Sequence, residues 1–166
     1  SDLFNERESS RWVIVTQKKV GDDTSVIEKI APKTWAYLKA HQDDLAKRTS
    51  SIYKNRPPFS IFGVGSYSFS PWKVAISGFY KEPRFRMIGT HLGKPIVPDD
   101  TVNFVSFGSA TDAKELAGLL NSNSALSFFR AITFVDAKRP YTVDLLKQLD
   151  MHKLTNRPRV KLSLFD

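Results

Sequence analysis

The segment Trp72-Lys73-Val74-Ala75-Ile76-Ser77 carries the clearest strand signal in the chain and fixes the expected fold class. Its apolar residues alternate with polar or small ones, and a β-strand points successive side chains to opposite faces of a sheet. Working outward, residues 84–88, 94–97 and 101–107 have the same texture, with glycine or proline turns between them. This spacing predicts an antiparallel meander in the middle of the chain.

The N-terminal third predicts a strand at residues 11–16 and then a helix. Pro32 suits the first turn of that helix, and Trp35, Leu38 and Leu45 recur on one stripe. Residues 59–62 alternate again and predict a further strand.

The C-terminal third predicts helices at residues 112–120, 124–132 and 142–149. Ser109 or Thr111 can cap the first of these helices. Residues 133–135 have the composition of a short strand, and residues 160–165 that of a last strand or a mobile basic tail. The expected class is therefore α+β, with strands in the middle, helices at both ends and one core.

The length of 166 residues suits one domain, with residues 1–10 and 151–166 as candidates for mobile ends. The chain has no cysteine, which excludes disulfides, thiolate metal sites and cysteine nucleophiles and fits a cytoplasmic protein. It has no apolar run of the ~18 residues that a membrane span needs. It begins with Ser1, as expected of a piece processed or excised from a longer protein.

The positive charge is concentrated in one segment. The chain has 25 basic and 17 acidic residues, and residues 47–86 hold eight of the basic ones against the single acid Glu82. The same segment has nine of the 20 aromatic residues. Cations neutralise phosphates and flat rings stack on bases, so this mixture favours a nucleic-acid surface. A solvated basic surface over an aromatic core explains the same composition.

The motif Asn55-Arg56-Pro57-Pro58-Phe59 resembles the Asn-Pro-Pro-aromatic motif of amino methyltransferases. In that motif the polar groups receive the target amino group while the ring stacks on the flipped base. Arg56 interrupts the required spacing here. We therefore interpret the motif as a proline-stiffened loop that enters a strand.

The motif Phe62-Gly63-Val64-Gly65 resembles a cofactor-binding glycine loop. Such a loop leads from a buried strand directly into a helix. The following Ser68-Phe69-Ser70-Pro71-Trp72 does not favour a helix, so the glycines are expected to form a turn or bulge instead. We expect no cofactor, metal or catalytic residue in this chain.

A nuclease-like pattern is the main enzymatic alternative. Asp99 is followed by Asp112-Ala113-Lys114 and by Asp136-Ala137-Lys138. Two carboxylates on adjacent strands can hold a magnesium ion, with the lysine stabilising developing charge. Asp112 is expected to open a helix, which leaves Asp136, after residues 133–135, in the better context. A magnesium-dependent nuclease of the PD-(D/E)xK kind remains open on these residues.

Residues 62–78, with the pattern Phe-Gly-Val-Gly-x-Tyr-x-Phe-x-Pro-Trp-Lys-Val, resemble the TaqI-like C-terminal specificity domain of adenine-specific DNA methyltransferases. Weaker support comes from residues 35–38, 45–48, 94–97, 119–122 and 136–140, so the resemblance covers about residues 34–149. It implies a modular restriction-modification enzyme in which an upstream catalytic domain binds S-adenosylmethionine. This chain would then contact double-stranded DNA and read the recognition sequence.

The resemblance implies two layers of DNA contact. The first clamps phosphates through central cations with Lys138 and Arg139. The second reads base edges. The residues expected to bind DNA are Lys54, Arg56, Tyr67, Trp72, Lys73, Lys81, Arg84, Arg86, Lys138 and Arg139.

Four of these residues, Arg56, Tyr67, Trp72 and Lys73, are favoured for facing a groove. Tyr67 is expected to project from its loop, and Lys73 to lie exposed on the opposite face of its strand and contact phosphate. Core packing is the alternative for Trp72. A surface that binds an acidic protein is a third reading of the whole chain, besides DNA recognition and the nuclease.

Overall fold

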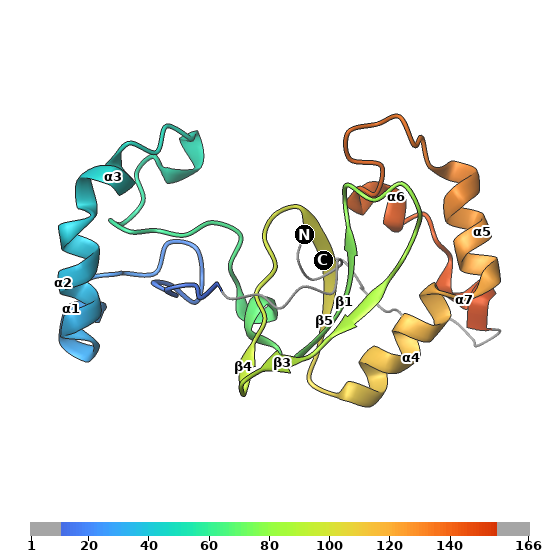
Figure 1. The fold of residues 1–166 in the computed structure, drawn as a ribbon, viewed down its shortest axis with the longest axis horizontal. Helices are drawn as coiled ribbons and strands as arrows, with labels where there is room; N and C mark the ends of the chain where they lie inside the picture. The colour runs from blue at the N-terminus through green and yellow to red at the C-terminus, as the bar shows by residue number, and fades with distance from the viewer. Residues whose placement is uncertain (1–10, 156–166) are drawn as a thin grey trace. The chain divides into compact units, whose positions relative to one another are not determined.

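The computed structural model describes residues 11–155, which divide into two compact units at residues 66 and 67. Each unit has its own apolar cluster, so the expectation of one core is wrong for the described residues. Helices and a small antiparallel sheet are both present, which confirms the α+β class. Figure 1 traces the elements along the chain.

The first unit, up to residue 66, consists of short helices and irregular segments. Its helices are α1 (Val26–Ile30), α2 (Pro32–Ala40), α3 (Gln42–Ala46) and the 3-10 helix η2 (Ser51–Tyr53). Pro32 lies at the start of α2 as predicted. The expected long helix is divided at His41, and Leu38 is the one buried residue of α2. Helix stability comes mainly from tertiary packing, and so small a buried face supports only short helices.

Two strands expected in the first unit are absent. Residues 11–16 and 59–62 form no strand. Trp12 and Val13 are 62% and 65% exposed, so the apolar stretch at residues 12–15 packs against no sheet. A strand needs a hydrogen-bonded partner, and a β-like composition alone does not supply one.

The second unit, from residue 67, is built on a three-stranded antiparallel sheet in the order β2-β1-β5. The central strand β1 is Trp72–Ser77, and the outer strands are β2 (Arg86–Ile88) and β5 (Val102–Phe107). Val74 pairs with Met87 on one side and with Val105 on the other. The antiparallel pairing is confirmed, but β5 returns beside β1, so the sheet is not a simple meander.

A two-stranded ribbon interrupts the connection from β2 to β5. It pairs β3 (Thr90–His91) with β4 (Lys94–Pro95). The two linking residues, Leu92 and Gly93, both have positive φ, at 48° and 75°. Two successive positive φ angles are those of a tight type I′ hairpin turn, which matches the twist of the strands.

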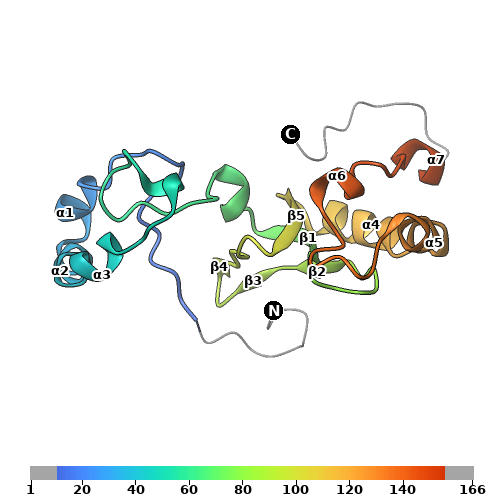
Figure 2. The same cartoon turned by 90° about the horizontal axis from the view of Figure 1, so that it is seen from above.

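The helices of the second unit cover one face of the sheet. Helix α4 (Ala110–Leu120) contacts β1, β2 and β5, and α5 (Asn123–Ile132) packs against α4 (Figure 2). The described part of the chain ends in α6 (Val143–Leu146) and α7 (Met151–Thr155), so the helix expected at residues 142–149 is shorter than predicted. The hydroxyls of Ser109, Ser122 and Thr142 accept hydrogen bonds from backbone N–H groups at the starts of α4, α5 and α6. The expected strand at residues 133–135 is absent, and residues 160–165 lie outside the described part of the chain.

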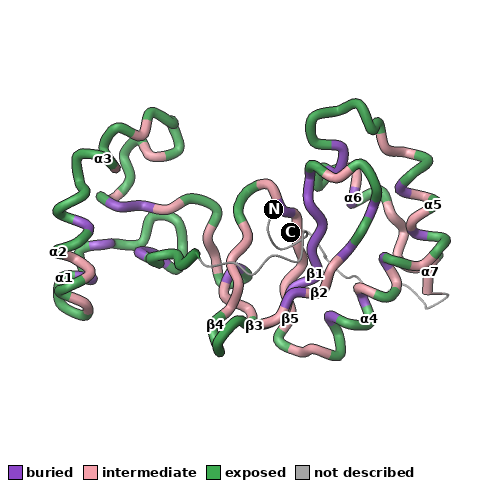
Figure 3. Tube along the Cα trace, viewed as in Figure 1, coloured by how far each residue is buried: buried purple, intermediate pink, exposed green. Residues whose placement is uncertain are grey.

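The alternation of β1 divides the core of the second unit. Val74 and Ile76 join the larger cluster with Phe85 and Phe129, beneath the helices. Ala75 joins the smaller cluster on the other face, with Ile88 and Val102. Nearly all of β1 is therefore buried on both faces (Figure 3).

Candidate nucleic-acid interface

The residues predicted to contact DNA are divided between the two units. Lys54 and Arg56 belong to the first unit, and the other eight belong to the second. Residues 10–66 contain ten basic and five acidic residues, so the first unit has a net charge of +5. Each unit therefore carries its own group of candidate contacts.

A loop with unusual backbone geometry presents Lys54 and Arg56. Asn55 and Phe59, on either side of the two prolines, have positive φ angles of 57° and 61°. Residues other than glycine rarely adopt this left-handed backbone region, and for a bulky residue such as phenylalanine the conformation is strained. Lys54, Asn55 and Arg56 are all exposed. The loop therefore combines an unusual backbone with two exposed cations.

Side-chain donors hold the four backbone carbonyls at residues 57–60. The hydroxyls of Ser60, Thr24 and Thr16 donate to the carbonyls of Pro57, Pro58 and Phe59, at 2.6, 2.6 and 2.8 Å. Arg48 donates from Nη1 to the carbonyl of Ser60 at 2.7 Å. A conformation with strained residues persists only when its surroundings over-determine it, and these bonds provide that. The loop is therefore preorganised.

The Phe59 ring is unavailable to a base. It is 4% exposed and meets Trp35 edge-on, with 5.3 Å between the ring centroids. The Asn-Pro-Pro-aromatic chemistry needs this ring to stack on the flipped base, so the geometry supports the interpretation as a proline-stiffened loop. The expectation that the loop enters a strand is wrong.

The glycine motif at residues 62–65 also lacks the geometry of a cofactor loop. Residues 11–61 contain no strand that could lead into it, and a 3-10 helix, η3 (Ser66–Phe69), follows in place of an α-helix. Gly63 has a φ of 70°, which suits the predicted turn. These residues do not fit a nucleotide or S-adenosylmethionine site.

Lys73 is buried, so the prediction that it lies exposed on β1 is wrong. It does point to the face opposite the helices, but that face is covered as well. Its Nζ donates to the carbonyl of Ser70 at 2.7 Å and lies 5.7 Å from the centroid of the Phe104 ring. Burial lowers the pKa of Lys73 to about 8. Lys73 acts here as a structural anchor for the chain just before β1.

Tyr67 and Trp72 differ in their surroundings. Tyr67 is 47% exposed in η3, as expected of a projecting residue, with its ring centroid 5.9 Å from that of Phe104. Trp72 is half-buried and packs against the larger apolar cluster. A Cβ added at Gly89 would lie 2.7 Å from the Trp72 ring, so the ring fills the space above that glycine. The structure favours core packing for Trp72.

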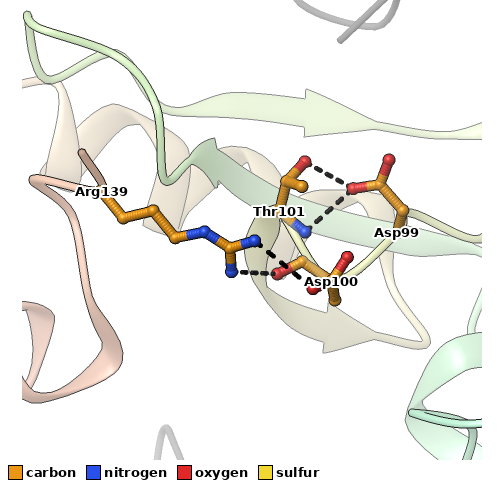
Figure 4. A network of polar contacts seen from close by, with 4 residues as sticks. All are labelled: Asp99, Asp100, Thr101 and Arg139. Atoms are coloured by element: carbon orange, nitrogen blue, oxygen red, sulfur yellow. Dashed lines mark hydrogen bonds and ion pairs between the residues drawn. The ribbon is translucent and has the colours of Figure 1, made fainter. Parts of the chain in front are cut away.

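Two of the predicted cations hold the loop between α5 and α6. Lys81 donates from Nζ to the carbonyls of Val135 and Ala137. Arg139 lies 3.5 Å from a carboxylate oxygen of Asp100 (Figure 4). Its guanidinium carbon is 5.1 Å from the centroid of the Phe79 ring. Both side chains are exposed, so each combines a structural contact with a charge that faces solvent.

The remaining predicted cations differ in exposure. Lys138 and Arg84 are exposed, and Arg86 is half-buried on β2. Sequence reasoning missed Arg130, whose Nε donates to Glu82 at 2.9 Å near the same loop. It also missed Phe134, which is 83% exposed. The signal for Phe134 was available, because residues 133–135 are apolar and lie just before Lys138 and Arg139.

The nuclease pattern is not assembled. Asp99 accepts bonds from the backbone N–H and the hydroxyl of Thr101, and the hydroxyl bond is the main reason that the pKa of Asp99 is lowered (Figure 4). Asp112 lies in the first turn of α4, as expected, and Asp136 lies in a turn without the expected strand. Within residues 11–155, no three His, Cys, Asp or Glu side chains gather closely enough to hold a metal ion.

A small cavity lies beside the Arg139 network in the second unit. Its volume is about 180 Å³, and its lining includes Gly78, Asn103, Arg139 and Tyr141. Sites for small molecules usually have at least ~300 Å³, so this cavity is better explained by local packing.

The helices at residues 11–155 were also compared with the length and hydropathy that a membrane span requires, and none of them meets both.

The chain is related in sequence to a Type II methyltransferase. It is 49% identical over 146 residues to M.NspV of Nostoc sp., and the match covers 88% of this chain. The chain spans about 30% of the length of that relative. No protein-family model matches the chain, and no solved structure matches it.

Proposed function

We propose that this chain is the target-recognition domain of a site-specific adenine DNA methyltransferase in a restriction-modification system. In this proposal, the rest of the parent protein performs S-adenosylmethionine-dependent methyl transfer in the cytoplasm. The observation that carries the proposal is the 49% identity to M.NspV across nearly the whole chain, although the chain matches only about 30% of that methyltransferase. This proportion suits one module of a modular enzyme.

The distribution of charge supports DNA as the partner. The first unit has a net charge of +5, and its strained loop presents Lys54 and Arg56 to solvent. Phosphate contacts set affinity and register, whereas a guanidinium can read guanine by donating two hydrogen bonds. We assign Arg56 to base reading because its loop is preorganised. Lys54, Lys81 and Lys138 are assigned to phosphates.

The preorganised loop gives the proposal a physical mechanism. Ordering a flexible loop on binding costs free energy, which weakens all sequences alike. A loop already fixed by Thr16, Thr24 and Arg48 avoids most of that cost. Binding energy from Arg56 can then separate the correct base from a wrong one by ~1–3 kcal/mol.

A domain exchange tests the proposal. The aligned 146-residue segment of M.NspV is replaced with this chain, and methylated bases are mapped across the genome of a host that expresses the chimera. We expect N6-methyladenine at one defined motif. In the same chimera, Arg56→Ala should broaden the base preference at one position of the motif, whereas the matched control Lys39→Ala, at an exposed cation of α2, should not.

Two results would contradict the proposal. One is cytosine methylation, which would remove the adenine assignment. The other is an active chimera whose motif is unaffected by both Arg56→Ala and Tyr67→Ala. If the chimera is inactive, methylated bases are first mapped in a host that expresses the full-length parent of this chain, and the same two substitutions are then made there.

Direct binding provides a second test. The isolated 166-residue chain should bind duplex DNA weakly and with little sequence preference, because the absent part of the parent would supply the remaining contacts. Its log affinity should fall linearly with log salt concentration. A slope near zero would instead support a surface for an acidic protein.

A further inference from the structure

Phe134 is the most exposed large apolar side chain in the described part of the chain, at 83%, and Val135 beside it is 48% exposed. Both lie in the loop at residues 133–139, between α5 and α6 (Figure 1). Single exposed apolar residues are normal on protein surfaces. This loop is distinguished by two further observations, its fixed backbone and its charged surroundings.

Hydrogen bonds fix the backbone on both sides of Phe134. The Thr133 hydroxyl donates to the Phe129 carbonyl at 2.6 Å, which ties the start of the loop to α5. The Ala137 N–H donates to the Phe134 carbonyl at 3.0 Å and closes a turn. Lys81 donates to the carbonyls of Val135 and Ala137 from outside the loop. The exposed ring is therefore held on a preorganised tip.

Four cations lie in this loop, just before it or in hydrogen-bond contact with it. Lys138 and Arg139 belong to the loop itself, and Lys81 donates to two of its carbonyls. Arg130 lies in the last turn of α5, just before the loop. All four side chains are exposed. Glu82 and Asp100 are paired with Arg130 and Arg139, and Asp136 is the one acid of the loop itself. A protein partner would be recognised by the same ring, but the four cations exceed these three acids by one charge, and a positive surface favours a polyanion.

We propose that Phe134 is an aromatic wedge that enters between stacked base pairs of double-stranded DNA, while Lys138 contacts the adjacent phosphate. The inference rests on the proposed DNA-recognition function and adds a contact that sequence reasoning did not assign. Apolar side chains that enter a base step unstack it partly and bend the duplex. Pyrimidine–purine steps such as TA unstack most easily and are the preferred target.

Affinity measurements test the wedge. The 166-residue chain is titrated by fluorescence anisotropy against a short duplex of mixed sequence with repeated TA steps, at several salt concentrations. Phe134→Ala should weaken binding about tenfold, which is typical of a lost base–aromatic stack. The salt dependence should stay unchanged, because no phosphate contact is lost. Lys138→Gln should reduce the salt slope by about 1.

The matched control is Leu92→Ala, which removes an exposed apolar side chain from the β3–β4 turn of the same unit. Leu92 is 77% exposed, so this substitution should leave the affinity unchanged. Because Phe134 packs against no core, both variants should keep the wild-type unfolding temperature, which is measured in parallel.

Chemical probing tests insertion directly. Permanganate oxidises thymines that are unstacked, so the wild-type chain should increase the reactivity of thymines at TA steps. Phe134→Ala should abolish the increase, and Phe134→Trp should retain it because the larger ring can still stack.

The outcomes separate the two proposals. Wild-type binding that Phe134→Ala leaves unchanged overturns the wedge alone. A variant that binds DNA normally but no longer assembles with the rest of the methyltransferase also overturns it and assigns the loop to an interdomain contact. If the wild-type chain binds no duplex at all, alone or in the chimera with M.NspV, the DNA-recognition function falls as well.

Discussion

Residues 67–155 and residues 11–66 are stabilised in different ways. The second unit has a hydrogen-bonded sheet with apolar clusters on both faces. The first unit has one small cluster, formed by Ile27, Leu38 and Phe59, and its central loop is held by side chains that donate to backbone carbonyls. The second unit therefore depends mainly on packing, whereas the loop of the first unit depends on a few directed hydrogen bonds.

The largest effect should come from the packed unit. Phe129 is 1% exposed, and its ring centroid lies 5.4 Å from that of Phe85. Phe129→Ala should lower the free energy of unfolding by about 3–5 kcal/mol, because it leaves a cavity among fixed neighbours. Urea denaturation measures this loss. Phe134→Ala is the same substitution at a solvent-exposed position and should lower the free energy of unfolding by less than about 0.5 kcal/mol. Equal losses for Phe129→Ala and Phe134→Ala would refute the description of the core.

The next effect concerns the one buried cation of the packed unit. The pKa of Lys73 is about 8 in the folded chain, below the ordinary 10.5, so the unfolded chain binds more protons between these values. Stability should therefore rise with pH above about 8, by on the order of 2 kcal/mol if the full window is reached.

Lys73→Met provides the control for this pH dependence. It should remove the rise while it keeps the apolar stem, and the two chains are compared by denaturation at pH 7 to 9.5. Burial raises the pKa of Tyr141, which adds an opposite slope at higher pH. Identical pH profiles for the two chains would show that Lys73 is hydrated.

The directed bonds of the first unit should have an intermediate effect. Thr24 is 1% exposed, and its hydroxyl donates to Pro58. Thr24→Val keeps the shape but leaves that carbonyl unpaired, which should cost about 1–3 kcal/mol. The loss should be confined to residues 11–66, where hydrogen exchange would quicken. Thr49→Val, at an exposed position, is the control; a global effect would mean that the two units unfold together.

The smallest effect should come from the exposed ion pair of Arg130 with Glu82. The two side chains are 54% and 73% exposed, and such pairs contribute little in water. Glu82→Gln should change the free energy of unfolding by less than about 0.5 kcal/mol. A loss near that of Thr24→Val would show that this exposed ion pair stabilises the second unit as much as a buried hydrogen bond stabilises the first.

The same comparison explains how much the sequence could predict. Strand β1, both long C-terminal helices and the Ser109 cap follow from periodicity and capping, and the structure confirms them. The strands expected at residues 11–16 and 59–62 failed, because β-like composition does not specify a partner. Alternation also placed Lys73 opposite Val74 correctly, but it could not reveal that Phe104 and Ser70 cover that face.

For the candidate interface, the sequence identified the charge but not its partners. Lys54, Arg56 and Lys138 are exposed as expected. The bonds of Lys81 to residues 135 and 137 join segments more than fifty positions apart, and a local pattern contains no information about them. The positive φ angle of Phe59 was equally out of reach, because phenylalanine rarely adopts it and the Thr16 hydroxyl that holds the Phe59 carbonyl lies 43 positions away in the sequence.

The loop at residues 57–60 is held by hydrogen bonds to its backbone carbonyl oxygens, which every amino acid possesses. The side chains at positions 54 and 56 take no part in these hydrogen bonds, so both positions can be randomised without disturbing them. Position 55 is the exception, since its left-handed backbone restricts it to asparagine, glycine or aspartate. A combinatorial library at positions 54 and 56 would therefore vary the exposed side chains of this loop on a constant backbone.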